Sequence, residues 1–84
     1  MTEDRRERIR LKLNDVFREV FEDDTLDIHA AMTAKDIDTW DSLMHIVLIV
    51  AIEKAFAVQL SASEIGRLEN VGAFLTLLEE RTSG

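Results

Sequence analysis

No proline occurs in the 84 residues of this chain, and glycine occurs only three times. Because these two residue types disfavour the interior of an α-helix most strongly, nearly the whole chain is free to be helical. Apolar residues make up 46% of the chain, which suffices for a hydrophobic core and argues against disorder. The length predicts one small all-α domain over residues 1–84, better suited to binding or carrying a molecule than to enclosing a deep catalytic cleft.

Four helices are predicted from apolar residues at helical spacing and from residues that cap helix ends. The first runs over about residues 3–21 with Thr2 as its cap, and the second over about residues 41–57. A capping box that begins with Ser61 starts a short third helix to about residue 68, and Asn70 caps the last. The apolar stripes of the first and last helices are Ile9, Leu13, Val16, Phe17 and Val20, and Val71, Phe74, Leu75 and Leu78.

Residues 22–40 follow no persistent period and form a long connection for a compact domain. Its apolar residues are expected to pin it to the core in an ordered conformation, and these are Leu26, Ile28, Met32 and Ile37. Trp40, at its end, is expected to fasten this loop to the core, because large aromatic side chains are generally well buried. A Trp40 that faces a partner protein is the alternative.

The second predicted helix is apolar on two sides. The expected core side consists of His45, Leu48, Ile49, Ile52 and Phe56. The far side consists of Leu43, Val47, Val50 and Lys54. Because a small domain cannot bury a helix on every side, this far side is predicted to be exposed and to serve as a docking surface.

Charge is distributed unevenly along the chain, whose formal net charge is −7. Residues 1–12 contain five basic and three acidic residues, a balance of +2, and the remainder carries −9. This distribution argues against nucleic acid as a partner and favours partners with basic docking surfaces. The arginines near the start alternate with acids and are predicted to form a solvated helix face, and they are Arg5, Arg6, Arg8 and Arg10.

The sequence also restricts the metal chemistry and the cellular location. It contains no cysteine, which excludes disulfides and thiolate metal sites, and two histidines do not make a structural zinc site. The acidic runs 22–24 and 36–38 lack the ligand spacing of an EF-hand. We expect a cytoplasmic protein without membrane insertion, because no signal peptide is visible and the apolar run 46–52 is far shorter than the about 20 residues that span a bilayer.

Asp41-Ser42-Leu43 stands where the long loop meets the second helix. A serine there is expected to be exposed and to lie at the positive end of the helix, where unpaired N–H groups favour a phosphate. The tripeptide alone is also consistent with a plain helix start, capped by Asp38 or Asp41.

The stretch Asp36-Ile37-Asp38-Thr39-Trp40-Asp41-Ser42-Leu43 resembles the modification site of acyl carrier proteins. The resemblance extends over nearly the whole chain: the helix order, the long first loop, Glu53 and Phe56 near the end of the second helix, and the capped short helix. It implies a four-helix bundle that catalyses nothing itself. It also implies that Ser42 carries 4′-phosphopantetheine, added from coenzyme A by a phosphopantetheinyl transferase, and that acyl groups are held as thioesters on the thiol of this group.

The resemblance further implies which residues surround the cofactor and which contact partners. Asp41, Leu43 and His45 would lie beside the modified Ser42. The partner surface for the transferase and for acyl-loading and acyl-processing enzymes would be Leu43, Met44, Ile46, Val47, Val50 and Glu53. The protein is expected to be a monomer.

Several residues depart from the common fatty-acid-synthase type of carrier. Val47 and Lys54 stand where that type often has acids, Met44 follows Leu43, and Trp40 replaces a small residue. The Trp-Asp-Ser-Leu form looks like stand-alone carriers of polyketide or other specialised pathways, and it suggests dedicated partners that dock by apolar contact. The Gly-Gly pair of peptidyl carriers is missing before Ser42, which favours an acyl cargo, with an aminoacyl cargo as the alternative.

Two other functions compete with the carrier interpretation. An unmodified helical interaction module would use the apolar far side of the second helix to bind a partner. A small hydrolase would use Ser42 and His45 as a dyad, but the orienting acid, the oxyanion site and the pocket of such an enzyme are not apparent. His45 is instead predicted to lie at the rim, near Ile49, where its protonated ring would contact the phosphate of the cofactor.

Overall fold

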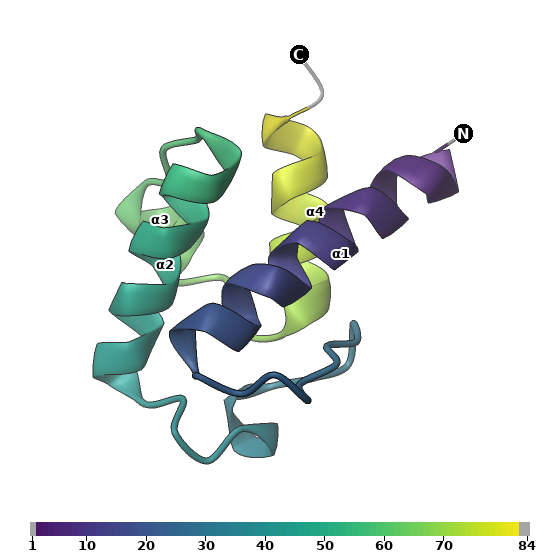
Figure 1. The fold of residues 1–84 in the computed structure, drawn as a ribbon. Coiled ribbons are helices and arrows are strands. Elements are labelled where there is room, and N and C mark those ends of the chain that lie inside the picture. Colours follow the sequence, from purple (N-terminus) through teal and green to yellow (C-terminus); the bar gives the residue numbers. More distant parts are fainter. Residues whose placement is uncertain (1, 83–84) are drawn as a thin grey trace.

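The computed structural model describes residues 2–82, with the side chains of residues 5–82. This part of the chain forms four α-helices, α1 (Thr2–Val20), α2 (Ser42–Phe56), α3 (Ala62–Ile65) and α4 (Val71–Arg81), and a 3-10 turn, η1 (Ala34–Asp36). Helix α1 packs against both α2 and α4. Figure 1 shows α1 running diagonally across α4, with its lower end beside the start of α2 and the long loop beneath both. The predicted all-α fold with a long first loop and a short third helix is confirmed.

The helix boundaries differ from the predicted ones by a few residues. Helix α1 begins at Thr2, so Thr2 is its first residue and not the capping residue before it. The side chain of Thr2 lies outside the described residues. Helix α2 begins at Ser42 because Asp41 has extended backbone angles and acts as the cap. It ends at Phe56, since Ala57 adopts a left-handed conformation with φ 55°. The third helix is shorter than predicted and ends at Ile65, because the N–H groups of Arg67 and Leu68 bond to carbonyls three residues back.

The predicted caps of α3 and α4 are confirmed. Ser61 accepts from the N–H of Glu64, whose carboxylate accepts from the N–H of Ser61 at 2.9 Å. The side chain of Asn70 accepts from the N–H of Ala73 at 2.8 Å. Each cap satisfies an N–H group that the first turn of a helix leaves without a partner.

The core lies where α1, α2 and α4 meet. Its fully buried members come from the predicted stripes and the loop, and the largest are Phe17, Phe74, Leu13, Ile28, Leu48, Ile52, Leu75, Leu78 and Val71. His45 and Phe56, predicted in the core stripe of α2, are half-buried at its edges. The side of α2 that was predicted to face the core does so, and its buried residues are Leu48, Ile49 and Ile52.

The long loop is ordered by contacts with α1 and α4. Ile28, Met32 and Ile37 are buried, and Leu26 is half-buried. Arg18 Nε donates to the carbonyl of Leu26 at 2.6 Å. Further along, the N–H of Val71 donates to the carbonyl of Met32 at 2.9 Å, which joins the loop to the start of α4. Near the start of the loop, hydrogen bonds from the hydroxyl and the N–H of Thr25 lower the pKa of Asp23.

Replacing Asn14 by alanine is expected to lower the free energy of unfolding by about 1–3 kcal/mol. Asn14 is buried, and its Oδ1 accepts from the N–H of Ile28 at 2.8 Å, so the substitution leaves a buried donor without an acceptor. Urea denaturation followed by circular dichroism measures the loss. Asp15→Ala, at the exposed neighbouring position, is the control and should change stability by less than about 0.5 kcal/mol. Equal effects of the two substitutions would contradict this role of Asn14.

The prediction of a solvated arginine face on α1 is wrong for three of its four members. Arg5 donates to the carbonyl of Glu79, and Arg6 forms an ion pair with the Glu79 carboxylate, so both fasten α1 to α4. Arg10 is half-buried and donates to Glu7 and to the carbonyl of Ile28, the latter at 3.2 Å. Arg8 is exposed, as predicted. No helix in the described part of the chain is long and apolar enough to cross a membrane.

Candidate functional site

Ser42 is the first residue of α2, and its side chain is exposed. Within the described part of the chain, its hydroxyl makes no hydrogen bond, and neither the N–H of Ser42 nor that of Leu43 has a partner. Two free backbone donors and the positive end of the helix dipole therefore lie beside a free hydroxyl. This arrangement suits a serine that carries a negatively charged group.

Asp41 fixes the point at which α2 begins. Its Oδ1 accepts from the N–H of Met44 at 2.9 Å, and its own N–H donates to the carbonyl of Thr39 at 3.0 Å. A side-chain cap of this kind typically stabilises a helix by about 0.5–2 kcal/mol. Asp41 is thus the cap, and Asp38, the other predicted candidate, is not.

Trp40 joins the site to the core. Its side chain is 6% exposed, and its ring meets Phe17 edge-on with centroids 5.5 Å apart. It also contacts Phe21 and Phe74, with centroids 6.0 and 6.1 Å away. The prediction that Trp40 fastens the loop to the core is confirmed.

His45 lies one turn after Ser42 and is half-buried at the rim of the core. Its ring lies nearly parallel to that of Trp40, with an interplanar angle of 16° and centroids 6.0 Å apart, and Trp40 Nε1 donates to His45 Nδ1 at 3.1 Å. Because a ring nitrogen that accepts a hydrogen bond carries no proton, this bond leaves Nε2 as the nitrogen of His45 that can donate. The contact between His45 and the cofactor phosphate stays a prediction.

This hydrogen bond also counts against a hydrolase. A general base needs a free unprotonated nitrogen to take the proton of the serine hydroxyl. In His45, Nδ1 is already engaged by Trp40, and Nε2 carries the proton. The Ser42–His45 pair is consequently not arranged as a catalytic dyad.

Four large apolar side chains are exposed along one side of α2, and together they form what we call the apolar strip: Leu43 (69% exposed), Ile46 (62%), Val47 (43%) and Val50 (43%). The strip starts directly after Ser42. Met44 and Glu53, the other predicted docking residues, are half-buried. The carboxylate of Glu53 accepts from the N–H of Leu60 at 2.9 Å, so it also holds the connection to α3.

A solved structure resembles this fold. The solution NMR structure of the holo acyl carrier protein from Geobacter metallireducens matches with a TM-score of 0.81 and 37% sequence identity, over 84% of this chain and 82% of that one. This chain belongs to the acyl carrier protein family. Acyl carrier proteins are carriers and not enzymes, so the chain is a carrier protein. No protein-family model and no curated protein sequence matches it.

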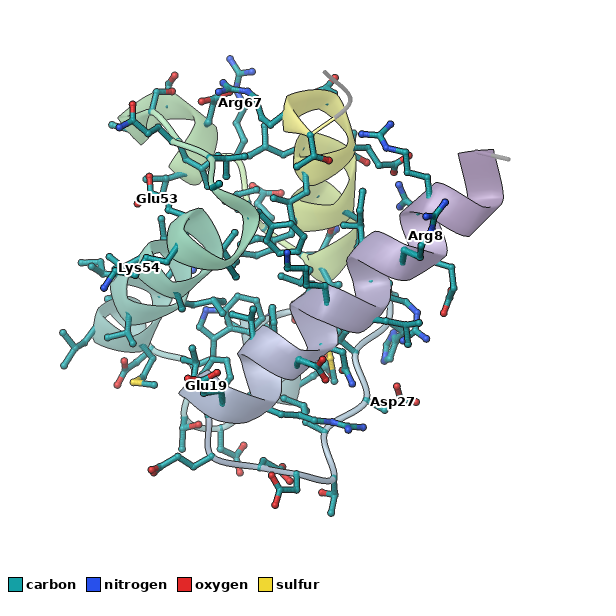
Figure 2. All side chains as sticks on the ribbon, turned by 45° about the horizontal axis from the view of Figure 1, so that its top comes forward. Arg8, Glu19, Asp27, Glu53, Lys54 and Arg67 are labelled. Carbon is teal, nitrogen blue, oxygen red and sulfur yellow. The ribbon has the colours of Figure 1, made fainter. Side chains whose placement is uncertain are left out.

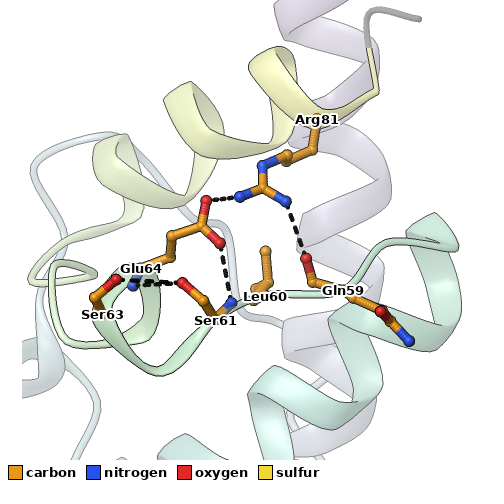
Figure 3. Close-up of a pocket in the computed structure, with 6 residues that line it drawn as sticks. All are labelled: Gln59, Leu60, Ser61, Ser63, Glu64 and Arg81. Carbon is orange, nitrogen blue, oxygen red and sulfur yellow. Dashed lines mark hydrogen bonds and ion pairs between the residues drawn. The ribbon is translucent and has the colours of Figure 1, made fainter.

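Among the described residues of this acyl carrier protein, no cluster of three or more His, Asp or Glu side chains could hold a metal ion. A surface hollow of about 580 Å³ lies between α3 and the end of α4, at the end of α2 away from Ser42. Figure 3 shows that its charged groups contact each other: Glu64 pairs with Arg81, and Arg81 Nη1 donates to the carbonyl of Gln59 at 3.1 Å. These contacts hold α3 and the segment before it against the end of α4.

Proposed function

We propose that this chain carries acyl intermediates as thioesters on a 4′-phosphopantetheine attached to Ser42. The observation that carries the proposal is the exposed hydroxyl at the first residue of α2, which makes no hydrogen bond to the described residues, in a family member similar to a holo acyl carrier protein. The chain contains no cysteine, so the thiol of a thioester has to come from a cofactor.

In the modification that we propose, Ser42 Oγ attacks the phosphorus of coenzyme A that bears the pantetheine. The Oγ–P bond forms, the pyrophosphate bond breaks, and adenosine 3′,5′-bisphosphate leaves. The transferase takes the hydroxyl proton. The free N–H groups of Ser42 and Leu43 then face a phosphodiester, which the positive end of α2 favours electrostatically.

His45 is proposed to position this phosphodiester through Nε2–H, the donor that the bond from Trp40 leaves available. Because the phosphorus chemical shift responds to the groups that contact the phosphate, it should differ between the modified wild type and modified His45→Ala. His29→Ala, at an exposed loop position, is the control and should leave the shift unchanged. Identical phosphorus shifts for the wild type and His45→Ala would refute the contact.

The exposed apolar strip supports the proposal that dedicated partner enzymes dock by apolar contact, as expected for a polyketide or other specialised pathway. We propose an acyl cargo, with an aminoacyl cargo as the alternative. We also propose that the chain is one domain and acts as a cytoplasmic monomer, since a net charge of −7 opposes self-association.

The test is the intact mass of the protein after incubation with coenzyme A and a broad-specificity phosphopantetheinyl transferase. The expected result is a gain of one phosphopantetheine group. A folded protein that gains nothing, while a control carrier is modified in the same tube, would favour an unmodified interaction module that binds through the apolar strip.

A further inference from the structure

A second hollow, which we call the basic hollow, lies at the end of the molecule away from Ser42. It has a volume of about 420 Å³ and lies where the first half of α1 meets the C-terminal ends of α2 and α4. Its lining side chains are Arg5, Arg8, Ile9, Lys12, Phe56 and Thr82, and no acid is among those that the structure describes. Ser42 is the first and Phe56 the last of the 15 residues of α2, so about 20 Å of helix separates Ser42 from the basic hollow.

The three cations of the basic hollow lie along one side of α1. Arg5, Arg8 and Lys12 are separated by three and four residues, which places them on consecutive turns. Among the described side chains, none of the three forms an ion pair, whereas the other two arginines in this half of α1 pair with acids. Arg5 Nη2 donates to the hydroxyl of Thr82 at 3.1 Å, and Lys12 Nζ lies 5.0 Å from the centroid of the Phe56 ring. Uncharged groups therefore hold two of these positive charges in place without neutralising them.

The helix ends beside the basic hollow account for only part of its charge. The C-terminal end of a helix carries roughly −0.5 of an elementary charge, so the ends of α2 and α4 together supply about −1. The hollow holds three positive side chains, so a charge of about +2 is left beyond what these helix ends offset. Stabilising α2 and α4 explains why some cations lie here and leaves the others without a structural partner.

This positive site lies on an otherwise acidic protein, whose net charge is −7. Exposed acids gather at the opposite end, around Ser42, and they include Glu22, Asp38 and Asp41. Figure 2 shows Arg8 on the half of α1 that is nearer the N-terminus and Glu19 near its other end. A partner that is attracted to the basic hollow therefore carries the opposite charge to a partner that is attracted to the Ser42 end.

The shape and spacing of the basic hollow indicate an acidic helix as its ligand. Arg5 and Lys12 are seven residues apart, or about 10 Å along α1, and acids at the same spacing on a facing helix would match this row. Ile9, which is buried, and Phe56, which is half-buried, form an apolar floor between the cations, suited to one apolar side chain.

Two other polyanions fit this hollow less well. An anionic bilayer is flat and cannot reach the apolar floor, and lipid-binding clusters usually contain about four to eight basic residues, more than the three present here. A nucleic acid would bring a long row of phosphates close to a chain of net charge −7, which repels it. The same net charge disfavours a second copy of this chain.

We propose that the basic hollow is a docking site for an acidic helical segment of a partner protein. The carboxylates of this segment would face Arg5, Arg8 and Lys12, and one of its apolar side chains would contact Phe56. Because Ser42 lies about 20 Å away along α2, the partner could stay bound while other proteins act at Ser42. The hollow would then tether the carrier to one component of its pathway. This tethering role rests on the proposed function, whereas the binding of the acidic segment does not.

The site is tested by titrating the ¹⁵N-labelled protein with a short helical peptide that has three glutamates at the spacing of the three cations and one leucine between them. We expect a Kd below about 1 mM, with amide shift changes centred on residues 5–12, Phe56 and Thr82. The control peptide has glutamine in place of each glutamate and should cause no such changes. No binding of the acidic peptide, or changes centred on residues 42–50, would overturn the proposal.

Charge reversal shows whether the peptide recognises the hollow or only the net charge of the protein. The double variant Arg8→Glu/Lys12→Glu should weaken peptide binding by about tenfold or more. Lys35→Glu/Arg67→Glu changes the net charge equally at two exposed positions outside the hollow, and it should stay within about twofold. Equal weakening by the two double variants would overturn the proposal. Circular dichroism verifies the folding of each variant, and Arg8→Gln/Lys12→Gln is used if the charge-reversed protein is unfolded.

Two further measurements address the competing ligands. Vesicles of phosphatidylcholine with phosphatidylglycerol should leave the amide shifts of residues 5–12 unchanged, and sedimentation should detect no dimer. Shift changes with the vesicles that Arg8→Glu/Lys12→Glu abolishes, or a dimer that this double variant disrupts, would overturn the proposal in favour of a membrane or a second copy.

The modification of Ser42 separates this inference from the proposed function. Ser42→Ala should bind the acidic peptide as the wild type does, and the wild type saturated with peptide should still gain phosphopantetheine from coenzyme A and the transferase. A bound peptide that blocks this mass gain would overturn the tethering role. A wild-type protein that binds the peptide but is never modified, with or without it, would instead contradict the assignment of Ser42 as a carrier serine and leave the docking site supported.

Discussion

Ser42→Ala should gain no mass when it is incubated with coenzyme A and the transferase, whereas the wild type gains one phosphopantetheine. The reason is chemical, because alanine offers no oxygen for the phosphodiester. Since the Ser42 hydroxyl makes no hydrogen bond within the described residues, its removal should change the free energy of unfolding by less than about 0.5 kcal/mol. Loss of modification would then not be a consequence of unfolding, and circular dichroism would verify this.

Two other hydroxyls provide matched controls for Ser42→Ala. Thr39 is exposed in the loop three residues earlier, and Ser63 is exposed on α3. Thr39→Ala and Ser63→Ala should both gain the full mass, because neither residue begins a long helix with free N–H groups. A mass gain that persists in Ser42→Ala and disappears in one of the controls would show that the phosphopantetheine is attached to that other residue. It would contradict the site described above.

The parts of the fold that were predictable are those encoded by near neighbours in the sequence. The caps at Ser61 and Asn70 are readable because a capping residue and its N–H partner lie three residues apart. The two sides of α2 follow from helical spacing, and Leu48 and Leu43 are buried and exposed as expected. The position of Ser42 followed from its place between the aperiodic loop and the apolar helix.

The parts that were missed depend on residues that are distant in the sequence. The Arg5 and Arg6 contacts with Glu79 join residues more than 70 positions apart, so no local spacing could indicate them. The basic hollow is similar, because it requires the packing of α1 against α2 and α4 as well as their separate patterns. The hydrogen bond from Trp40 to His45 is also of this kind, because it depends on how the buried indole packs in the core.

Trp40→Ala is expected to have the largest effect on stability, a decrease of about 3–5 kcal/mol in the free energy of unfolding. It removes a ring that contacts Phe17, Phe21 and Phe74, and it leaves a cavity where the loop meets the core. Trp40 is the only tryptophan, so unfolding in urea has to be followed by circular dichroism instead of fluorescence. Leu43→Ala is the control, because Leu43 is 69% exposed and its truncation should cost less than about 0.5 kcal/mol.

Native domains are stable by only about 5–15 kcal/mol, so a loss of this size can unfold a chain this small. Trp40→Phe therefore provides the second measurement, because it keeps an aromatic ring in the core and removes the N–H that His45 Nδ1 accepts. We expect it to remain folded and to change the tautomer of His45, visible in the ¹⁵N shifts of the imidazole. Equal stability of Trp40→Ala and Leu43→Ala would contradict the anchoring role. An unchanged His45 tautomer in Trp40→Phe would show that the indole does not determine which nitrogen of His45 faces the phosphate. It would contradict the proposal that Trp40 orients the His45 ring toward the phosphate.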